Sequence, residues 1–282
     1  MKRIEMAKAI QLLLLSFFLF TSSIVHATQR EQKPLVMGFF PIISTVALFK
    51  RFVPLKNYLS DQLGREIVME TAKDFPTFVK RTAERRYDFV FTAPHFAVRA
   101  EDSGLYHIRV TPPNVLRVLI AVRKESAITD VNGLEGKRIS SPPKGALVSM
   151  IGKDRLDSIG LTGARLPQYQ YYSTHNAAYQ AVVGGRADAV ISANNVVLKK
   201  INEGVPLKVI DQGEAFPSMA ILVASDLPET FSSKLTHAMV EMKNTVIGQR
   251  VLKVVGFSGY QAASIADYEV VRSYAYRKKN AD

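Results

Sequence analysis

The 282-residue chain contains no cysteine and no tryptophan. Without cysteine it can form no disulfide bond, no thiolate nucleophile and no zinc site with thiolate ligands. Hydrophobic residues make up 47% of the sequence and charged residues 22%, values that are typical of globular proteins and argue against disorder and coiled coil. The length suits one two-lobed domain or two domains.

The local motifs of several enzyme classes are absent as well. No GxSxG elbow, HExxH pair or P-loop occurs in the sequence. His95, His107, His175 and His237 are scattered, and no two of them have the i,i+4 spacing that seats a metal ion. No close pair of carboxylates shares a loop for glycosidase chemistry. We therefore expect no metal, no cofactor and no enzyme, although an active site assembled from distant residues is the least favoured alternative.

One long apolar run lies near the N-terminus. Lys2, Arg3 and Lys8 precede the segment AIQLLLLSFFLFTSSIV, and the small residues of VHA end at Ala27. These features predict a secretory signal peptide, residues 1–27, and an uncleaved membrane anchor is the alternative. No cysteine follows the run, which excludes lipid attachment there, so we expect a periplasmic protein that is not a lipoprotein. The rest of the chain has no further stretch of 18 or more apolar residues.

Basic residues exceed acidic ones, and the formal net charge is +12. A basic exported protein can bind an anion, an acidic partner or a membrane surface, and charge alone does not separate these. Nucleic-acid binding is not expected, because the basic residues are dispersed and no recognition motif accompanies them.

The first part of the mature chain alternates between strand and helix patterns. Leu48, Phe52 and Leu55 begin a series spaced by three or four residues, which predicts the buried face of a helix. Pro54 lies inside this series, and we expect it to bend the helix or restart it. Such alternation favours a parallel sheet with helices on both faces. Strands are expected at 34–41, 66–72 and 87–94, and helices at 44–64 and 74–86.

Two longer extended segments, 115–124 and 218–225, bracket a second alternating block. In and after this block, strands are expected at 136–142, 168–173, 187–192 and 206–213, and helices at 145–161, 174–185 and 227–243.

This order predicts an α/β protein of two lobes, each a mostly parallel sheet flanked by helices, joined by two hinge strands. Lobe 1 is expected to be discontinuous, with residues 34–117 and 222–282, and lobe 2 to comprise residues 118–221. Ligands of such sheets bind at the carboxyl ends of the strands, near helix N-termini. In a two-lobed protein those ends can face each other across a cleft.

Five polar loops follow predicted strands, and each supplies hydroxyl, imidazole, amide or ammonium groups, or free backbone N–H groups. Two of the loops open helices, whose N-terminal N–H groups and dipoles favour anions. The loops are at 39–45, 91–96, 140–146, 172–177 and 192–195.

Each loop residue also has an ordinary structural alternative. Ser44 and Thr174 can be helix caps, Lys144 a solvated surface charge, and His95 a turn residue. Five polar loops at one end of two sheets together favour a cleft site. The candidate ligand-binding residues are Ser44, Thr92, His95, Ser141, Lys144, Gly145, Ala146, Thr174, His175, Asn176 and Asn195.

Between residues 36 and 225 the sequence resembles the phosphate, phosphite and phosphonate-binding periplasmic proteins of ABC transporters. The segments that carry the resemblance are GFFPIISTVALFKRFVPLKNYLSDQLG, AKDFPTFVKRTAERRYDFVFTAPHFAVRA, LEGKRISSPP and STHNAAYQAVVGGRADAVIS. The resemblance implies a type II periplasmic binding protein fold that closes on an anionic ligand and delivers it to a permease.

The resemblance also assigns roles to residues. In that family, hydroxyls and backbone amides at a helix start of the middle lobe hold the phosphorus oxyanion, and a histidine matched here by His175 assists. Ser44 lies in the matching first loop. Residues 94–96 match the third loop, where the family often places a tyrosine just beyond, whereas this chain has Ala97. At 143–148 the family's Ser-Thr-Ser-Gly stretch is replaced by PKGALV, which supplies a lysine but no hydroxyl.

We therefore expect a monomeric solute-binding protein for a small anion, with a phosphorus oxyanion first among the candidates and an inner-membrane ABC permease as its partner. Another oxyanion or a less charged ligand stays open. The alternative is a periplasmic sensory subunit on the same fold that signals to a membrane receptor such as a histidine kinase.

Overall fold

The computed structural model of the chain describes residues 33–277. The expected signal peptide, residues 1–27, lies outside the described residues. Within residues 33–277 we find no helix with the length and apolar character that a membrane span requires.

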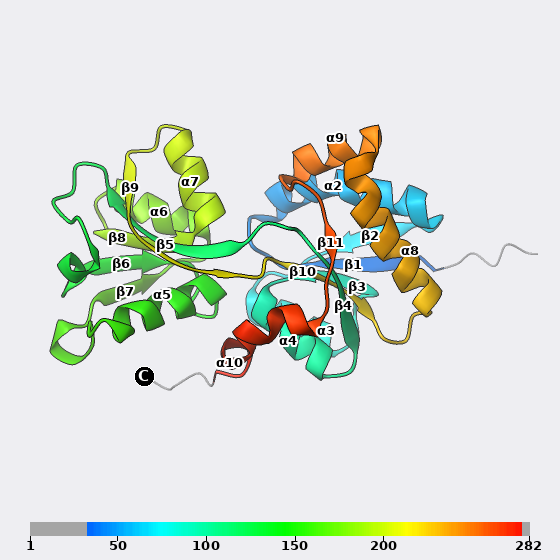
Figure 1. The fold of residues 1–282 in the computed structure, drawn as a ribbon, viewed down its shortest axis with the longest axis horizontal. Coiled ribbons are helices and arrows are strands. Elements are labelled where there is room, and N and C mark those ends of the chain that lie inside the picture. The colour runs from blue at the N-terminus through cyan, green and yellow to red at the C-terminus, as the bar shows by residue number, and fades with distance from the viewer. Residues whose placement is uncertain (1–32, 278–282) are drawn as a thin grey trace, which may run out of the picture. The chain divides into compact units, whose positions relative to one another are not determined.

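The described part of the chain forms two separate sheets (Figure 1). In the first, which we call sheet A, strands β1, β2 and β3 are parallel, β10 runs antiparallel beside β3, and β4 runs antiparallel beside β10. Its strand order is β11-β4-β10-β3-β1-β2. The bounds are β1 Leu35–Phe39, β2 Ile67–Glu70, β3 Phe89–Thr92, β4 Tyr106–Thr111, β10 Ala220–Ala224 and β11 Gln261–Ala262.

Helices cover both faces of sheet A. Successive strand residues point to opposite faces, and here the residues on both faces are apolar. In β3, Phe89 and Phe91 belong to the core beneath α2, α8 and α9, whereas Val90 belongs to the core on the side of α3 and α4. Figure 1 shows these two layers. The bounds are α2 Thr45–Leu63, α3 Phe75–Ala83, α4 Pro94–Asp102, α8 Glu229–Val240, α9 Val246–Val255 and α10 Arg272–Ala275.

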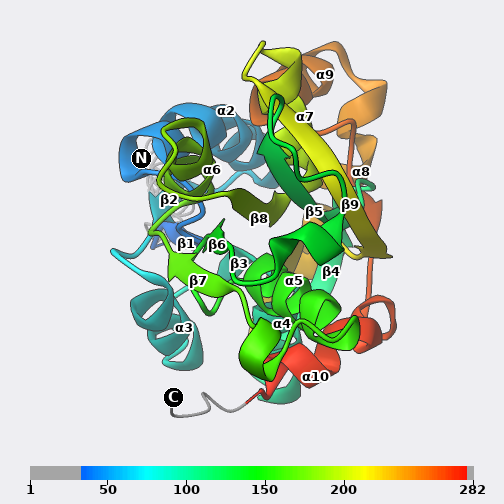
Figure 2. The ribbon, with the colours of Figure 1, turned by 90° about the vertical axis from the view of Figure 1, so that its left-hand side faces the viewer.

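The second sheet, sheet B, has the order β7-β6-β8-β5-β9. Strands β6, β7 and β8 are parallel, and β5 runs antiparallel between β8 and β9. Helices α6 and α7 share a core with one face, and α5 packs on the other (Figure 2). The bounds are β5 Leu116–Arg123, β6 Arg138–Ser141, β7 Gln168–Tyr171, β8 Ala189–Ala193, β9 Leu207–Phe216, α5 Leu147–Ser158, α6 His175–Val183 and α7 Asn194–Asn202. Short 3₁₀ helices occupy Val131–Leu134, Gly163–Arg165, Glu241–Asn244 and Ile265–Val271.

Two linkers, residues 112–115 and 217–219, connect the sheets. In sheet A, the start of β10 pairs with the end of β3, Ala220 opposite Thr92. In sheet B, the start of β5 pairs with the end of β8, Val118 opposite Ala193. Both linkers therefore lie at the ends of the sheets where the parallel strands have their carboxyl ends. We call these two ends the linker edges.

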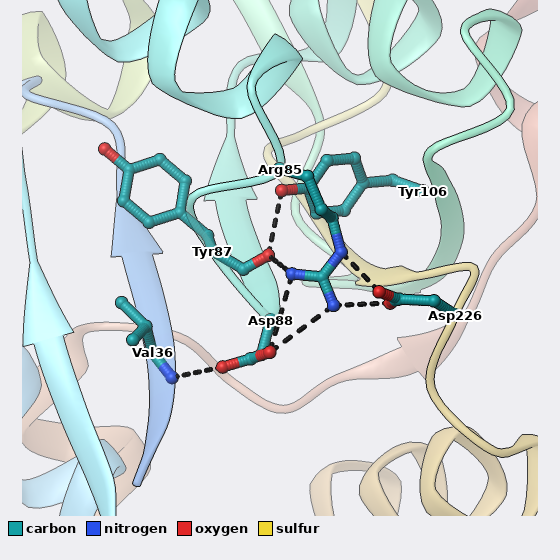
Figure 3. Close-up of polar contacts among 6 residues, drawn as sticks. All are labelled: Val36, Arg85, Tyr87, Asp88, Tyr106 and Asp226. Carbon is teal, nitrogen blue, oxygen red and sulfur yellow. Dashed lines mark hydrogen bonds and ion pairs between the residues drawn. The ribbon is translucent and has the colours of Figure 1, made fainter. Parts of the chain in front are cut away.

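At the other end of each sheet, where the parallel strands begin, an aspartate side chain accepts a hydrogen bond from a neighbouring strand. Asp88 accepts a hydrogen bond from the backbone N–H of Val36 at 2.7 Å, and Asp188 accepts one from the backbone N–H of Arg138 at 2.9 Å. Figure 3 shows the first network, in which Arg85 lies between Asp88 and Asp226. The aspartate that precedes each apolar strand is therefore structural, and it lies at the end of its sheet opposite the linkers.

Several details differ from the sequence predictions. Helix α2 continues through Pro54 without a restart. The apolar side chains on both sides of Pro54, such as Phe52 and Leu59, are buried against the same sheet, which offsets the roughly 3 kcal/mol that an interior proline costs. The loops expected at 91–96 and 192–195 are partly helical, because Pro94 suits the first turn of α4 and α7 begins directly after β8.

Candidate ligand-binding site

The carboxyl ends of the strands lead directly into helix N-termini. β1 leads to α2, β3 to α4, β6 to α5, β7 to α6 and β8 to α7. The first N–H groups of a helix have no partner within the helix, and the dipole places a partial positive charge there. The edges joined by the linkers are therefore lined with backbone donors.

Most of these helix starts lack a side-chain cap. Within residues 33–277, Ser44, Ala93, Ala146 and Ala193 are the N-cap residues of α2, α4, α5 and α7, and none accepts a capping hydrogen bond on its side chain. Elsewhere α3 and α9 are capped by Asp74 and Thr245. The uncapped starts leave backbone N–H groups available to an anion. The sequence left open that Ser44 caps α2, but its hydroxyl accepts no capping hydrogen bond.

His95 connects the two sheets. It lies in the first turn of α4, is 2% exposed, and its Nε2 is 3.1 Å from the carbonyl oxygen of Gly145 in the loop before α5. Because a carbonyl only accepts, Nε2 carries the proton in this pair. Burial lowers the pKa of His95 to about 4, and the positive charge of Arg99 acts in the same direction. The ring is therefore neutral at pH 7, and its Nδ1 is buried without a partner among the described residues.

His175 is the first residue of α6 and is oriented by the next strand. Its Nδ1 lies 2.7 Å from the hydroxyl of Ser192 near the end of β8. Burial lowers the pKa of His175 to about 4, so this ring is also neutral at pH 7. The pair with Ser192 occupies Nδ1 and leaves Nε2 for another contact. Ser192 begins the predicted polar loop 192–195 but was not among the candidate ligand-binding residues.

The other residues of the segment STHN divide between capping and exposure. The Thr174 hydroxyl accepts a hydrogen bond from the backbone N–H of Ala177 at 3.1 Å and therefore caps α6. Asn176 is exposed on the first turn of the same helix. Thr174 thus fixes the helix start, whereas Asn176 has its amide in solvent.

Hydrogen bonds between buried serine hydroxyls stabilise the loop before α5. The hydroxyls of Ser141 and Ser149 lie 2.7 Å apart, and the Ser149 hydroxyl donates to the carbonyl of Pro142 at 3.1 Å. Both serines are buried, and through its contact with Ser149 the Ser141 hydroxyl supports the loop. Lys144 and Gly145 are exposed in the same loop, and Ala146 is buried at its end.

Thr92 and Asn195 are the remaining candidates. Thr92 is 1% exposed. It lies two residues after Val90 in the strand, so its side chain points to the same face of the sheet as Val90, the side of α3 and α4. Asn195 is exposed. Its neighbour Asn194, which sequence reasoning missed, accepts from the backbone N–H of Arg117 at 3.2 Å and donates to the carbonyl of Val115 at 3.3 Å.

No cluster of three or more histidine, aspartate or glutamate side chains arranged to hold a metal ion occurs in residues 33–277. The donors gathered at the linker edges are instead backbone N–H groups, hydroxyls, an ammonium group and neutral imidazoles.

Comparison with known proteins assigns the family. Residues 37–268 match the family model described as "ABC transporter, phosphonate, periplasmic substrate-binding protein". The chain belongs to this family. Its members bind a substrate in the periplasm for a membrane permease, and the family is one of transport proteins and not of enzymes.

Solved structures show the same fold. PhnD1 from Prochlorococcus marinus, in complex with methylphosphonate, superposes with a TM-score of 0.77 at 16% identity, over 86% of this chain and 97% of that one. A binding protein of a Pseudomonas aeruginosa phosphonate transporter gives 0.74 at 15% identity, over 86% and 85%. XAC2383 from Xanthomonas citri, bound to ATP, gives 0.71 at 13% identity, over 86% and 95%. This phosphonate-binding family member therefore has the expected type II periplasmic binding protein fold, with two sheets flanked by helices.

Proposed function

We propose that this family member captures a small anion, a phosphorus oxyanion such as phosphonate, phosphite or phosphate, between the carboxyl ends of the two sheets. It delivers the anion to an ABC permease in the inner membrane. The observation that carries the proposal is the set of uncapped helix starts at the linker edges, together with two neutral histidines held by Gly145 and Ser192.

Backbone donors suit an ionised oxyanion better than a neutral ligand. The uncapped helix starts present N–H groups and a partial positive charge, and an anion near such a start is stabilised by roughly 0.3–1 kcal/mol or more. The start of α4 offers fewest, because Pro94 has no N–H and the N–H of Phe96 donates to the carbonyl of Ala93. In α5 the N–H groups of Leu147 and Val148 follow directly after the loop that bears Lys144. These amides and the ammonium group take the place of the hydroxyl-rich stretch of the family.

The histidines act in this proposal as neutral hydrogen-bonding groups. Because burial holds the pKa of His175 at about 4, the ring contributes no positive charge at pH 7. Its Nε2 carries the proton when the Ser192 hydroxyl donates to Nδ1, and it then donates to the anion. Asn176, one residue later, supplies an exposed amide on the same helix turn.

Closure is proposed as a hinge motion about the linkers, residues 112–115 and 217–219. With the hinge there, the described part of lobe 1 comprises residues 34–111 and 220–277 and lobe 2 residues 116–216, because Leu116 already pairs in sheet B and Ala220 in sheet A. The hydrogen bond between His95 and Gly145 joins the two lobes and breaks when they separate.

The same proposal includes export by a signal peptide cleaved after Ala27, without lipid attachment, and a monomeric state. The sensory alternative finds no support in the family match, which is to transport proteins.

The proposal is tested by a thermal-shift panel on the chain that begins at residue 28. The ligands are methylphosphonate, phosphite, phosphate, sulfate and ATP, the first and last because related structures contain them. A ligand at 100 times its Kd stabilises the folded state by about 2.7 kcal/mol, which raises the melting temperature measurably. A rise with a phosphorus oxyanion supports the proposal, and an unchanged melting temperature with every anion contradicts it.

A further inference from the structure

A cavity lies within lobe 1 on the side of α3 and α4, and Phe96 in its lining lies beside His95. It has a volume of about 300 Å³, which is at the lower end of the range of small-molecule sites. Helices α3 and α4 form its walls, and Tyr276 near the C-terminus closes one side. Its lining from the two helices is largely apolar, with Phe78, Val79, Ala83, Phe96 and Ala100.

A buried hydroxyl lies in the lining of this cavity. Thr92 is 1% exposed, and its Oγ1 has no hydrogen-bond partner within residues 33–277. The other threonine of the lining, Thr82, differs because its hydroxyl donates to the carbonyl of Phe78 at 2.9 Å. An unpaired buried hydroxyl is costly, so a ligand group that pairs with Thr92 is favoured.

The rim of the cavity carries an arginine outside an ion pair. Arg99 of α4 is exposed and forms no ion pair with another described residue. The rim carboxylate, Asp102, accepts from the hydroxyl of Tyr276 at 2.6 Å and pairs with Arg272, which it shares with Glu269. The Arg99 guanidinium is therefore the rim cation that has no ion pair within residues 33–277, and it can pair with an anion.

We propose that this cavity binds an amphipathic organic monoanion, a short aliphatic or aromatic body that carries one carboxylate. The apolar body lies between the α3 and α4 side chains, and the carboxylate oxygens accept from the Arg99 guanidinium and from the Thr92 hydroxyl. The site goes beyond the proposed oxyanion site and does not depend on it, because the two share no side chain apart from Thr92, which faces the α3 and α4 side.

The test is an NMR titration of the ¹⁵N-labelled chain from residue 28 with benzoate and with hexanoate. Methylphosphonate is present throughout, so that the site between the sheets is occupied. Saturable shifts confined to the amides of α3, α4 and the segment around Tyr276 are expected. Benzyl alcohol has the same ring without the charge, and it is expected to bind about fivefold more weakly. Equal affinity for the alcohol contradicts the role of Arg99.

Single substitutions locate the contacts. Arg99→Gln is expected to weaken benzoate about fivefold. Arg250→Gln removes an exposed arginine from α9, on the other face of sheet A, and is the matched control that leaves affinity unchanged. Thr92→Val keeps the side-chain shape and removes the unpaired hydroxyl, so it is expected to raise the melting temperature of the free protein and weaken benzoate about fivefold.

The outcomes separate this site from the first one. His175→Ala is expected to leave benzoate binding unchanged, and loss of benzoate binding in that variant places the ligand between the sheets and overturns the proposal. Shifts that do not saturate, or an affinity unaffected by both Arg99→Gln and Thr92→Val, overturn it as well. Failure of the oxyanion panel with intact benzoate binding counts against the first proposal alone.

Discussion

The imidazole Nε2 of His95 donates a hydrogen bond to the carbonyl oxygen of Gly145 over 3.1 Å. The two residues are 50 positions apart: His95 is in the first turn of α4, after β3 of sheet A, and Gly145 is in the loop after β6 of sheet B. Because His95 is buried and neutral, the bond holds the two edges together without a charge on the imidazole ring. The proposed oxyanion is bound beside this contact by backbone N–H groups and His175.

His95→Phe is expected to lower the free energy of unfolding by about 1 kcal/mol. Phenylalanine keeps an aromatic ring beside Phe96 but removes the donor to Gly145. Urea unfolding measures the change. Gly145→Ala is the matched control, since a Cβ at this position meets no atom within 4 Å and the carbonyl acceptor remains. Equal stability of His95→Phe and Gly145→Ala would show that the bond contributes nothing.

The free energy of unfolding is expected to fall as the pH decreases from 6.5 towards 4. Burial lowers the pKa of His95 to about 4 in the folded protein, whereas an unfolded histidine has a pKa of about 6.5. Between these values the unfolded chain binds a proton that the folded protein does not, so acid favours unfolding, by at most about 1.4 kcal/mol per pH unit for this residue. Urea unfolding at several pH values measures the slope. His95→Phe is expected to flatten it, and an unaltered slope in that variant contradicts the assignment.

Ser192→Ala is expected to weaken binding of the oxyanion about tenfold, because His175 loses the partner that orients its ring. Calorimetric titration measures the affinity. Ser141→Ala is the control, since Ser141 is equally buried but pairs with Ser149 inside the loop. It is expected to reduce stability and leave the affinity unchanged. If both variants bind equally well, His175 does not contact the ligand in the proposed way.

Asn194→Ala is expected to lower the free energy of unfolding by about 1–2 kcal/mol. The side chain makes two hydrogen bonds to the backbone of Val115 and Arg117, where the first linker enters β5. The neighbouring substitution Asn195→Ala affects an exposed side chain and should change stability by no more than about 0.5 kcal/mol. Thermal unfolding distinguishes the two, and a larger effect at 195 than at 194 would reverse this assignment.

The alternation of strands and helices could be predicted from the sequence, because buried strands appear as short apolar runs whereas helix faces show apolar residues every three or four positions. The strands expected at 34–41, 66–72 and 87–94 are confirmed as β1, β2 and β3. Strand β4 was missed even though YHIRVT alternates, with Tyr106, Ile108 and Val110 buried. The polar residues between them weakened the apolar signal that marks the other strands.

The site was harder to predict because the direction of a side chain depends on the pleat of its strand. Thr92 ends β3 in a polar loop, yet it shares the facing of Val90, so it points to α3 and α4. Ser140 and Ser141 likewise point to opposite faces, the first towards the Ala178 carbonyl of α6 and the second towards Ser149 of α5. The sequence located the loops, but only the folded structure shows which residue of each loop faces the linkers.

The most direct test of the central claim is isothermal titration calorimetry of the chain from residue 28 with methylphosphonate, phosphite and phosphate, alongside the His175→Ala variant. The account predicts saturable binding of one ion per chain for at least one of these anions, and an affinity at least about tenfold weaker in the variant. Absence of binding heat with all three anions, or an undiminished affinity in His175→Ala, would contradict it.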